Sequence, residues 1–416
     1  MNYQEALAYI HSVNWTFCKP GLERVTALCE ALGNPQDDLK FIHVAGTNGK
    51  GSFCAMTASI LQAAGYRTGL FTSPYIKMFN ERMQVDGVPI ADEELADLTA
   101  FVRPVADAMD DKPTEFELIT AIAFLYFKRH HCDVVVLETG MGGRLDATNL
   151  IRHPLLSVIT GIALDHTAFL GDTVPQIAAE KAGIIKENCP VLWGGENAEA
   201  EAVIAATAQE KNAPYQRVDR LPLQVHEATL DGTRFSYGAY RDVTLSLLGL
   251  YQPHNVATVL SAIPMLTEQG FVVSTEAVRK GLSSVYWPAR FEVLSRQPLV
   301  IFDGAHNVQG IAAAVHSIRH YFSTQKVYVL TGVLKDKDYT AIAQQLASVA
   351  QHAFVLTPDN PRALAGEEYA ALLESLGVPA TAYGSVGEAY AAARAAAETD
   401  GIPLLCLGSL YTYASL

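Results

Sequence analysis

The chain has 416 residues, of which 50% are hydrophobic and 18% are charged, and its formal net charge is −14. These values exclude wholesale disorder and predict two or three domains, since a domain usually holds roughly 100–200 residues. The negative charge argues against a protein that binds nucleic acid or an anionic membrane, because such proteins carry a basic surface.

The N-terminus carries Glu5 and lacks the cationic region and the unbroken apolar run of a signal peptide. The longest apolar runs, such as residues 134–137, fall far short of the roughly 20 residues that span a bilayer. We therefore expect a cytoplasmic protein with reduced thiols, because no C-x-x-C pair occurs. The cysteines are Cys18, Cys29, Cys54, Cys132, Cys189 and Cys406.

The first half of the chain alternates short apolar runs with segments of helical periodicity, which predicts a mostly parallel α/β sheet. The run at 133–137 has no polar alternation, so we expect a central strand that is covered on both faces. Residues 73–89 are expected to form a polar loop, and 217–247 a small antiparallel sheet. The other expected strands are 41–45, 69–72 and 155–160, and the expected helices are 52–64, 115–130, 173–186 and 253–267.

The pattern breaks at Pro288 and Pro298, which indicates a linker over residues 286–298. The remainder predicts a second alternation of strands and helices, so we expect a smaller Rossmann-like domain over 299–416 after a P-loop-containing, mostly parallel domain over 1–285. Its expected strands are 299–302, 326–331, 353–357 and 403–407, and its expected helices are 308–321, 339–349, 366–376 and 386–398.

The strongest single motif is GTNGKGS at residues 46–52, between a predicted strand and a predicted helix. Glycines let backbone N–H groups approach phosphate oxygens, and the helix N-terminus adds partial positive charge. Lys50 is expected to bridge the outer phosphates, although the glycine spacing differs from the usual P-loop. A glycine-rich turn that binds nothing is the alternative, and the strand, lysine and helix in register disfavour it.

Polar residues follow two further predicted strands. Glu138 ends the apolar strand, where a carboxylate next to a phosphate loop is an expected magnesium ligand, the alternative being an ordinary strand-end acid. His166 follows the strand at 155–160, and the pattern leaves a metal ligand, a proton-transfer group and a packed histidine open. Lys181 alone is typical of a solvated helix lysine.

The second half carries DGAHN after its first predicted strand, and Arg290 lies just upstream in the expected linker. Asp303 and His306 would reach a nucleotide that is clamped between two domains. An ordinary polar strand-to-helix turn is the alternative for this motif.

Taken together, eight motifs in sequence order resemble those of the folylpolyglutamate synthases, the folate-modifying branch of the Mur-type ATP-dependent amide ligases. The match runs from about Phe41 to Asn307 and extends to residues 408–411. The motifs are GTNGKGS, TSPYIKMFNERMQVDG, TEFE, ETGMGGRLDATN, DH…EKAGIIK, LLGLYQPHN, WPARFE and DGAHN.

The resemblance implies that ATP phosphorylates the terminal carboxylate of a folate and that the amine of L-glutamate attacks the acyl phosphate. The carboxylate needs a leaving group, and the anionic transition states need cations and N–H donors. The implied cofactors are ATP and two Mg²⁺, with a monovalent cation left open, and the implied state is a monomer. Some relatives also join glutamate to dihydropteroate. GGRLDATN is compatible with that activity, which the sequence leaves open.

The resemblance also implies roles for individual residues. Lys181 matches the lysine that is carbamylated in these ligases, which replaces the solvated interpretation, and Phe116 would stack on the folate ring system. Tyr75 stands where many members have histidine, so details of the pterin pocket depart from the family. The implied catalytic residues are Lys50, Lys181, His166 and His306; the ATP contacts are Asn48, Gly49, Lys50, Gly51, Ser52, Asn255, Arg290 and Asp303; the magnesium ligands are Ser73, Glu138 and His166; and the folate pocket holds Arg82, Thr114, Glu115, Phe116, Glu117, Leu145, Asp146 and Ala147.

Two alternative functions stay open at this point. A ligase that adds an amino acid to a UDP-linked muramyl peptide shares GTNGK, but it usually carries an additional N-terminal domain, for which about 40 residues precede the first motif here. A P-loop ATPase without ligase chemistry would hydrolyse ATP whether or not glutamate is present. It would leave the second domain unexplained.

Overall fold

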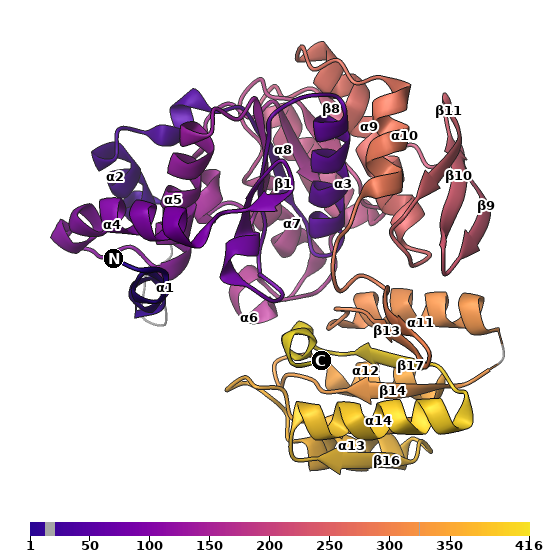
Figure 1. Ribbon diagram of the computed structural model, residues 1–416. Helices are drawn as coiled ribbons and strands as arrows, with labels where there is room; N and C mark the ends of the chain where they lie inside the picture. Colours follow the sequence, from indigo (N-terminus) through magenta and orange to yellow (C-terminus); the bar gives the residue numbers. More distant parts are fainter. Residues whose placement is uncertain (13–20, 324) are drawn as a thin grey trace. The chain divides into compact units, whose positions relative to one another are not determined.

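The computed structural model describes residues 1–12, 21–323 and 325–416, and these form two compact units (Figure 1). The first unit holds Met1–Leu223, Tyr237–Tyr240 and Asn255–Val285, and the second holds Gln224–Ser236, Arg241–His254 and Tyr286–Leu416. Each unit is built on its own largely parallel sheet with helices, so the predicted mixed α/β class is confirmed.

The first unit contains an eight-stranded sheet in the order β4-β3-β2-β5-β1-β6-β7-β8. Neighbours from β2 to β8 pair in parallel, and β3 and β4 extend one edge in antiparallel. The expected loop over 73–89 is therefore wrong in part, because strands of two or three residues are too short for a periodic pattern. The strands are β1 Phe41–Ala45, β2 Thr68–Phe71, β3 Met83–Val85, β4 Val88–Pro89, β5 Val134–Glu138, β6 Leu156–Ile159, β7 Val191–Trp193 and β8 Tyr215–Arg217.

Helices cover both faces of this sheet, as the unbroken burial of β1 and β5 requires. Helix α3 follows β1 and packs against β2, β5 and helix α10. The helices are α1 Tyr3–Ser12, α2 Glu23–Ala31, α3 Lys50–Ala63, α4 Asp92–Ala108, α5 Glu115–Arg129, α6 Thr167–Leu170, α7 Val174–Ala182, α8 Ala198–Glu210, α9 Gln252–Glu268 and α10 Thr275–Ser284, with 3₁₀ turns η1 Pro35–Asp38, η2 Phe79–Arg82 and η3 Ala147–Leu150.

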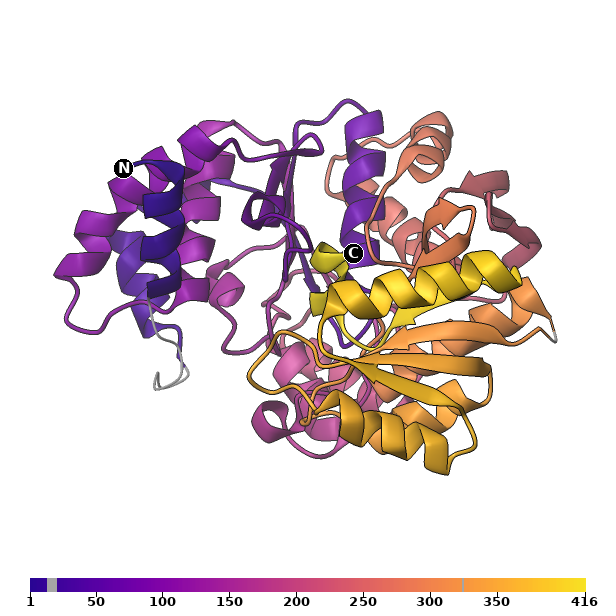
Figure 2. The same cartoon turned by 60° about the horizontal axis from the view of Figure 1, so that its bottom comes forward.

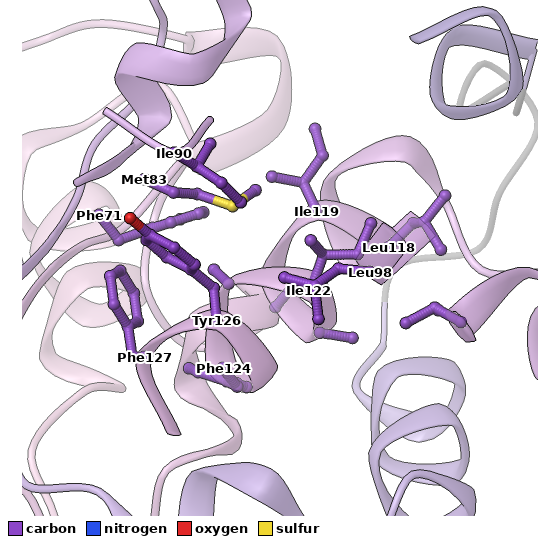
Figure 3. Close-up of a cluster of buried hydrophobic side chains, with 14 of the residues drawn as sticks. Phe71, Met83, Ile90, Leu98, Leu118, Ile119, Ile122, Phe124, Tyr126 and Phe127 are labelled. Atoms are coloured by element: carbon purple, nitrogen blue, oxygen red, sulfur yellow. The ribbon is translucent and has the colours of Figure 1, made fainter. Parts of the chain in front are cut away.

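A large apolar cluster of this unit joins α5 to strands β2 and β3 (Figure 3) and also includes residues of β5. Phe71 and Met83 come from neighbouring strands, whereas Leu118, Ile122 and Phe127 line the inner face of α5. Each of these side chains is at most 1% exposed, and full burial of such a side chain contributes about 1.5–3 kcal/mol. This cluster fixes α5, and with it the TEFE motif, against the sheet.

The second unit contains a six-stranded sheet in the order β12-β13-β17-β14-β15-β16, and helix α14 lies on the opposite face from α11–α13 (Figure 2). Strand β12 lies inside the stretch 286–298 that was expected to be a linker, so this stretch joins the sheet. The strands are β12 Glu292–Arg296, β13 Leu299–Phe302, β14 Val327–Thr331, β15 Ala350–Leu356, β16 Ala380–Tyr383 and β17 Leu404–Leu407; the helices are α11 Val308–Phe322, α12 Tyr339–Ala347, α13 Gly366–Ser375 and α14 Val386–Asp400, with the 3₁₀ turn η4 Leu410–Ser415.

A separate three-stranded sheet, β11-β10-β9, covers the stretch in which a small antiparallel sheet was predicted. Its strands are β9 Leu223–Thr229, β10 Gly232–Tyr237 and β11 Tyr240–Leu245. Their two-residue connections require antiparallel neighbours, because a parallel pair needs a crossover of a dozen or more residues.

No helix within the described ranges combines the length and the apolarity that crossing a membrane requires. The described cysteines are buried thiols without a disulfide bond: Cys29, Cys54, Cys132, Cys189 and Cys406. Cys18 lies outside the described residues.

Candidate active site

The predicted phosphate loop connects β1 to α3 in the first unit. Gly49 precedes the first residue of α3 with φ +88°, and a Cβ there would lie 2.8 Å from Asn255 Oδ1. A Cβ on Gly46 would lie 2.0 Å from Thr160 Oγ1. Glycine is therefore required twice, once by backbone conformation and once by close approach. The N-terminus of the 14-residue helix α3 begins at Lys50 and supplies partial positive charge to this loop.

The end of strand β6 holds the loop in place. The Thr47 N–H donates to the Gly161 carbonyl (2.7 Å), and the Thr160 hydroxyl donates to the Asn48 carbonyl (2.8 Å). Ser52, in the first turn of α3, is 1% exposed. The loop is thus ordered by the protein itself, which preorganises its backbone groups for an anion.

Two lysines converge on one carbonyl oxygen of the loop. Lys50 Nζ donates to the Gly46 carbonyl (3.0 Å), and Lys181 Nζ on α7 donates to the same oxygen (2.9 Å). Lys181 is only 4% exposed, so the solvated interpretation is wrong. Burial, and then the charge of Lys50, lower the pKa of Lys181 to about 7, against the opposing charges of Asp165 and Asp146.

Glu138 lies beside this loop because the parallel register pairs it with Val44 on β1. Its carboxylate is buried, accepts from the Ser73 N–H (3.3 Å) and lies 4.0 Å from Lys50 Nζ. The Ser73 hydroxyl and the Glu138 carboxylate are hard oxygen donors of the kind that Mg²⁺ prefers.

The third expected magnesium ligand, His166, lies on the turn after β6. It is exposed, has φ +50°, and its N–H donates to Asp165 Oδ1 (2.9 Å). In the part of the chain that the structure describes, no group of three or more His, Cys, Asp and Glu side chains is arranged to hold a metal ion. The fit to Mg²⁺ therefore rests on the Ser73 and Glu138 pair, and a metal role for His166 stays a prediction.

Two residues of the TEFE motif stabilise helix α5. Thr114 and Glu117 form a capping box, in which the Thr114 N–H donates to Glu117 Oε2 (2.6 Å). Glu117 also accepts two hydrogen bonds from Arg24 (2.9 and 3.0 Å), and both side chains are buried. Glu115 pairs with His11 (3.3 Å). These contacts explain the motif structurally, and its expected role in binding folate stays a prediction.

Phe116, the other member of that motif, is half-buried and faces the glycine-rich loop after β5. A Cβ on Gly140 would lie 2.6 Å from Phe116 Cζ, and the Phe71 ring centroid lies 5.9 Å from that of Phe116. Arg82, another expected pocket residue, lies over the Tyr75 and Phe79 rings at 5.1 and 5.6 Å. Tyr75 thus contributes a ring face to a cation–π contact at the position where the family often has histidine.

Residues 144–150, which we name the folate-side loop after the role that the family resemblance predicts for Leu145, Asp146 and Ala147, lie against helix α7. The Arg144 N–H donates to the Glu180 carbonyl (2.7 Å), and the Arg144 guanidinium pairs with the Glu180 carboxylate (2.8 Å). Asp146 is buried and accepts from Met141 N–H (2.8 Å), while burial raises its pKa. Leu145 is partly exposed, whereas Ala147 is buried at the start of η3. The loop therefore lies next to the helix that carries Lys181.

The second unit holds the remaining predicted residues. Asp303, at the end of β13, is buried and accepts from the Tyr251 hydroxyl (2.7 Å) and the Phe291 N–H (3.0 Å). Burial raises the pKa of Asp303. Arg290 lies close by, since a Cβ on Gly304 would lie 2.7 Å from its Nη1, and His306 Nδ1 lies 2.9 Å from the Gly304 carbonyl oxygen.

The sequence reasoning missed several residues that position these groups. Tyr251 lies in the quoted LLGLYQPHN motif, but its hydrogen bond to Asp303 joins positions 52 residues apart. Thr160 is a single polar residue at the end of an apolar run and Arg24 is one of several polar residues in its segment, and no local pattern marks either of them. Lys181 was named through the family resemblance, and its burial also had a signal in the sequence, because Ile177, Ala178 and Ala182 form the buried stripe of α7 on which it lies.

Comparison with known proteins matches residues 44–263 to the Mur ligase middle domain and residues 289–410 to the Mur ligase glutamate ligase domain. The chain is 42% identical over 372 residues to the dihydrofolate synthase/folylpolyglutamate synthase of Bacillus subtilis, an alignment that covers 87% of this chain and 86% of that protein. The apo form of L. casei FPGS is similar with a TM-score of 0.87 at 37% identity, and an FPGS–AMPPCP–folate complex with a TM-score of 0.88 at 38% identity. Each covers 100% of this chain and is itself covered to 98%.

Proposed function

The chain belongs to the folylpolyglutamate synthase/dihydrofolate synthase family of the Mur ligases, and we propose on that basis that it is an ATP-dependent ligase that adds L-glutamate to folate. The observation that carries this proposal is the ordered phosphate loop with Lys50 beside the buried Glu138. An FPGS that is similar over the whole chain forms a complex with AMPPCP and folate.

The reaction has two bond exchanges. An oxygen of the folate γ-carboxylate bonds to the γ-phosphorus of ATP as the bond to ADP breaks, which gives an acyl phosphate. The glutamate amine then bonds to the acyl carbon, phosphate leaves, and the amine loses a proton to give the amide. The loop N–H groups and Lys50 stabilise the negative charge that the phosphates carry.

Magnesium is the expected metal of this site, and Ser73 and Glu138 are the residues that would hold it. Bound Mg²⁺ supplies charge neutralisation to the phosphate oxygens. A second ion, a monovalent cation and a ligand role for His166 remain predictions from the family resemblance.

A carbamate on Lys181 is supported by the burial of that side chain and by its pKa near 7. Only a neutral amine reacts with carbon dioxide, and a lysine with a pKa near 7 is neutral in about half of the molecules at pH 7. A carbamate there would supply anionic oxygen near Glu138 and the loop.

Arg290, Asp303 and His306 in the second unit are proposed to contact the nucleotide and the glutamate side of the reaction, in line with the matched glutamate ligase domain. The division of labour between residues 1–285 and 299–416 is part of the same proposal. A cytoplasmic location, a monomeric state and a second activity toward dihydropteroate also stay predictions.

The test is phosphate release from ATP with magnesium and L-glutamate, with tetrahydrofolate, dihydropteroate or a UDP-muramyl peptide added in turn. We expect release that requires both glutamate and tetrahydrofolate, and further release with dihydropteroate would add the second activity. Release with the muramyl peptide alone would indicate the cell-wall ligase. Phosphate release that does not depend on any of these acceptors would indicate an ATPase, and either result would overturn the proposal.

A further inference from the structure

A histidine in the middle of strand β1 has no role in the site described above. His43 is fully buried between β5 and β6, and its Nε2 lies 2.8 Å from the Thr148 hydroxyl of the folate-side loop. Thr148 is also fully buried. The contact joins the central strand of the sheet to a loop that lies 105 residues further along the chain.

The hydrogen bonds around Thr148 define where its proton lies. Asp146 accepts from the Thr148 hydroxyl and from the Thr148 N–H (3.0 Å), and its other oxygen accepts from the Met141 N–H. Both oxygens of Asp146 accept from backbone N–H groups, and the Thr148 hydroxyl is the donor in its bond to Asp146 Oδ1. The same hydroxyl oxygen must then accept from His43 Nε2–H.

The other ring nitrogen agrees with this assignment. His43 Nδ1 is buried and meets no hydrogen-bond partner among the described residues, as expected of the lone pair in a neutral Nε2–H tautomer. Burial, and then the charge of Lys186, lower the pKa of His43 to about 3, so the ring is neutral at physiological pH.

We propose that His43 is a positioning residue for folate: its Nε2–H orients the Thr148 hydroxyl, which in turn orients the Asp146 carboxylate in the folate-side loop. The inference rests on the proposed function, because it takes this loop as part of the folate pocket. It assigns His43 no contact with substrate.

The other hydrogen bonds that hold the folate-side loop do not replace the relay, by which we mean the chain of hydrogen bonds from His43 through Thr148 to Asp146. Asn149 Nδ2 donates to the Arg144 and Gly183 carbonyls (both 3.0 Å), and Lys186 Nζ donates to the Asn149 carbonyl (3.0 Å). These bonds hold the backbone at the two ends of the loop. The Asp146 side chain in its middle is held by the backbone N–H groups of Gly140 and Met141 and by Thr148. Thr148 is the member of this set that contacts His43, so loss of the His43 donor acts on the carboxylate through Thr148.

The experiment compares His43→Leu with His43→Gln, since the glutamine amide preserves a donor near the Nε2 position. In His43→Leu we expect the KM for tetrahydrofolate to rise by up to about tenfold, the upper end of the effect expected for one hydrogen bond between neutral groups, with the KM for ATP unchanged. His43→Gln should restore the KM for tetrahydrofolate to within about twofold of the wild type.

Ser157→Ala is the matched control. Ser157 is the register neighbour of His43 on β6, is equally buried, and donates to the Ile184 carbonyl rather than to the folate-side loop. It should lower the melting temperature without changing the KM for tetrahydrofolate. If His43→Leu does not fold, Thr148→Val against Thr148→Ser tests the same relay, and the valine variant alone should raise this KM.

An unchanged KM for tetrahydrofolate in His43→Leu or Thr148→Val overturns the inference. So does an equal rise in the KM values for ATP and tetrahydrofolate, because that indicates a general disturbance of the sheet. Wild-type protein that fails to ligate folate contradicts the proposed function as a whole, whereas active wild-type protein with insensitive variants contradicts the relay alone.

Discussion

Replacement of Lys181 by alanine tests the most unusual group of the site. The amine is 4% exposed and hydrogen-bonds the Gly46 carbonyl. If carbamylation converts it into an anionic oxygen ligand near Glu138, Lys181→Ala should lower kcat by about 100-fold or more, since loss of a ligand's outer-shell partner alone costs about 10–100-fold. A small added carboxylate such as acetate should restore part of this activity.

The lowered pKa of Lys181 sets the fraction of its amines that are neutral and can react with carbon dioxide. With a pKa of about 7, about half of the Lys181 amines are neutral at pH 7. An exposed lysine, whose pKa lies near 10.4, is neutral in about one molecule in 2,500 at the same pH. Burial and the charge of Lys50 therefore raise the reactive fraction by about three orders of magnitude.

The assay is reactivation of protein that has been freed of carbon dioxide at low pH and then supplied with a fixed concentration of dissolved carbon dioxide. The rate should rise with pH up to about 7 and then level off, because the amine is neutral above its pKa. ¹³C-labelled bicarbonate should give a carbamate NMR signal that is absent in Lys181→Ala. Wild-type activity in that variant, or a reactivation rate that keeps rising to pH 10, would refute the reasoning.

Three further predictions follow from burial and backbone geometry. Gly49→Ala should raise the KM for ATP and destabilise the protein by about 1–2 kcal/mol in thermal unfolding, because φ is +88° there and the new Cβ meets Asn255; an unchanged KM would contradict the role of the loop. Arg24→Ala should lower the free energy of unfolding in urea by about 3–5 kcal/mol, since it leaves the buried Glu117 without its cation. A change below about 1 kcal/mol, which is typical of exposed ion pairs, would contradict the role given to this buried pair. Lys181→Met should be more stable than carbon dioxide-free wild type by up to about 5 kcal/mol at pH 6, and this difference in the free energy of unfolding should shrink from pH 7 to 10.5. Over that window the unfolded wild type binds the proton that the folded form has lost, so the wild type gains stability as the pH rises. A difference that is constant with pH would contradict the lowered pKa of Lys181.

The central strands could be predicted from the sequence because each is an apolar run that ends at a turn. The expected strands at 41–45 and 299–302 coincide with β1 and β13. The edge strands could not be predicted in this way, since β3 and β4 hold three and two residues and β12 is half-exposed along most of its length. Pairing with a neighbour creates such strands: β3 pairs with β4 across Asp86-Gly87, and β12 pairs with β13, which follows it directly. A short turn marks these pairs in the sequence, and an apolar run does not.

The candidate site likewise has one part that the local sequence predicts and another that it does not. The phosphate loop is a local feature, so glycines, lysine and helix start were predictable from seven consecutive residues. The burial of Lys181 was not recognised, because a lysine beside Glu180 is typical of a solvated face until the stripe of Ile177 and Ala178 is considered. The hydrogen bond of His43 joins two segments 105 residues apart, so it requires the sheet register.

The convergence of Lys50 and Lys181 on the Gly46 carbonyl links nucleotide binding to the chemistry of the buried amine. Two ammonium groups on one oxygen repel each other, and this repulsion is one cause of the lowered pKa of Lys181. Lys50, which we propose contacts the phosphates, thus also favours loss of the proton from Lys181. If that neighbour is carbamylated as proposed, the same proximity becomes an attraction, because Lys50 would lie between two anions, the other being Glu138 at 4.0 Å. In the proposed site, Lys50 and the loop would then contact phosphate while the carbamate and Glu138 oxygens would hold magnesium.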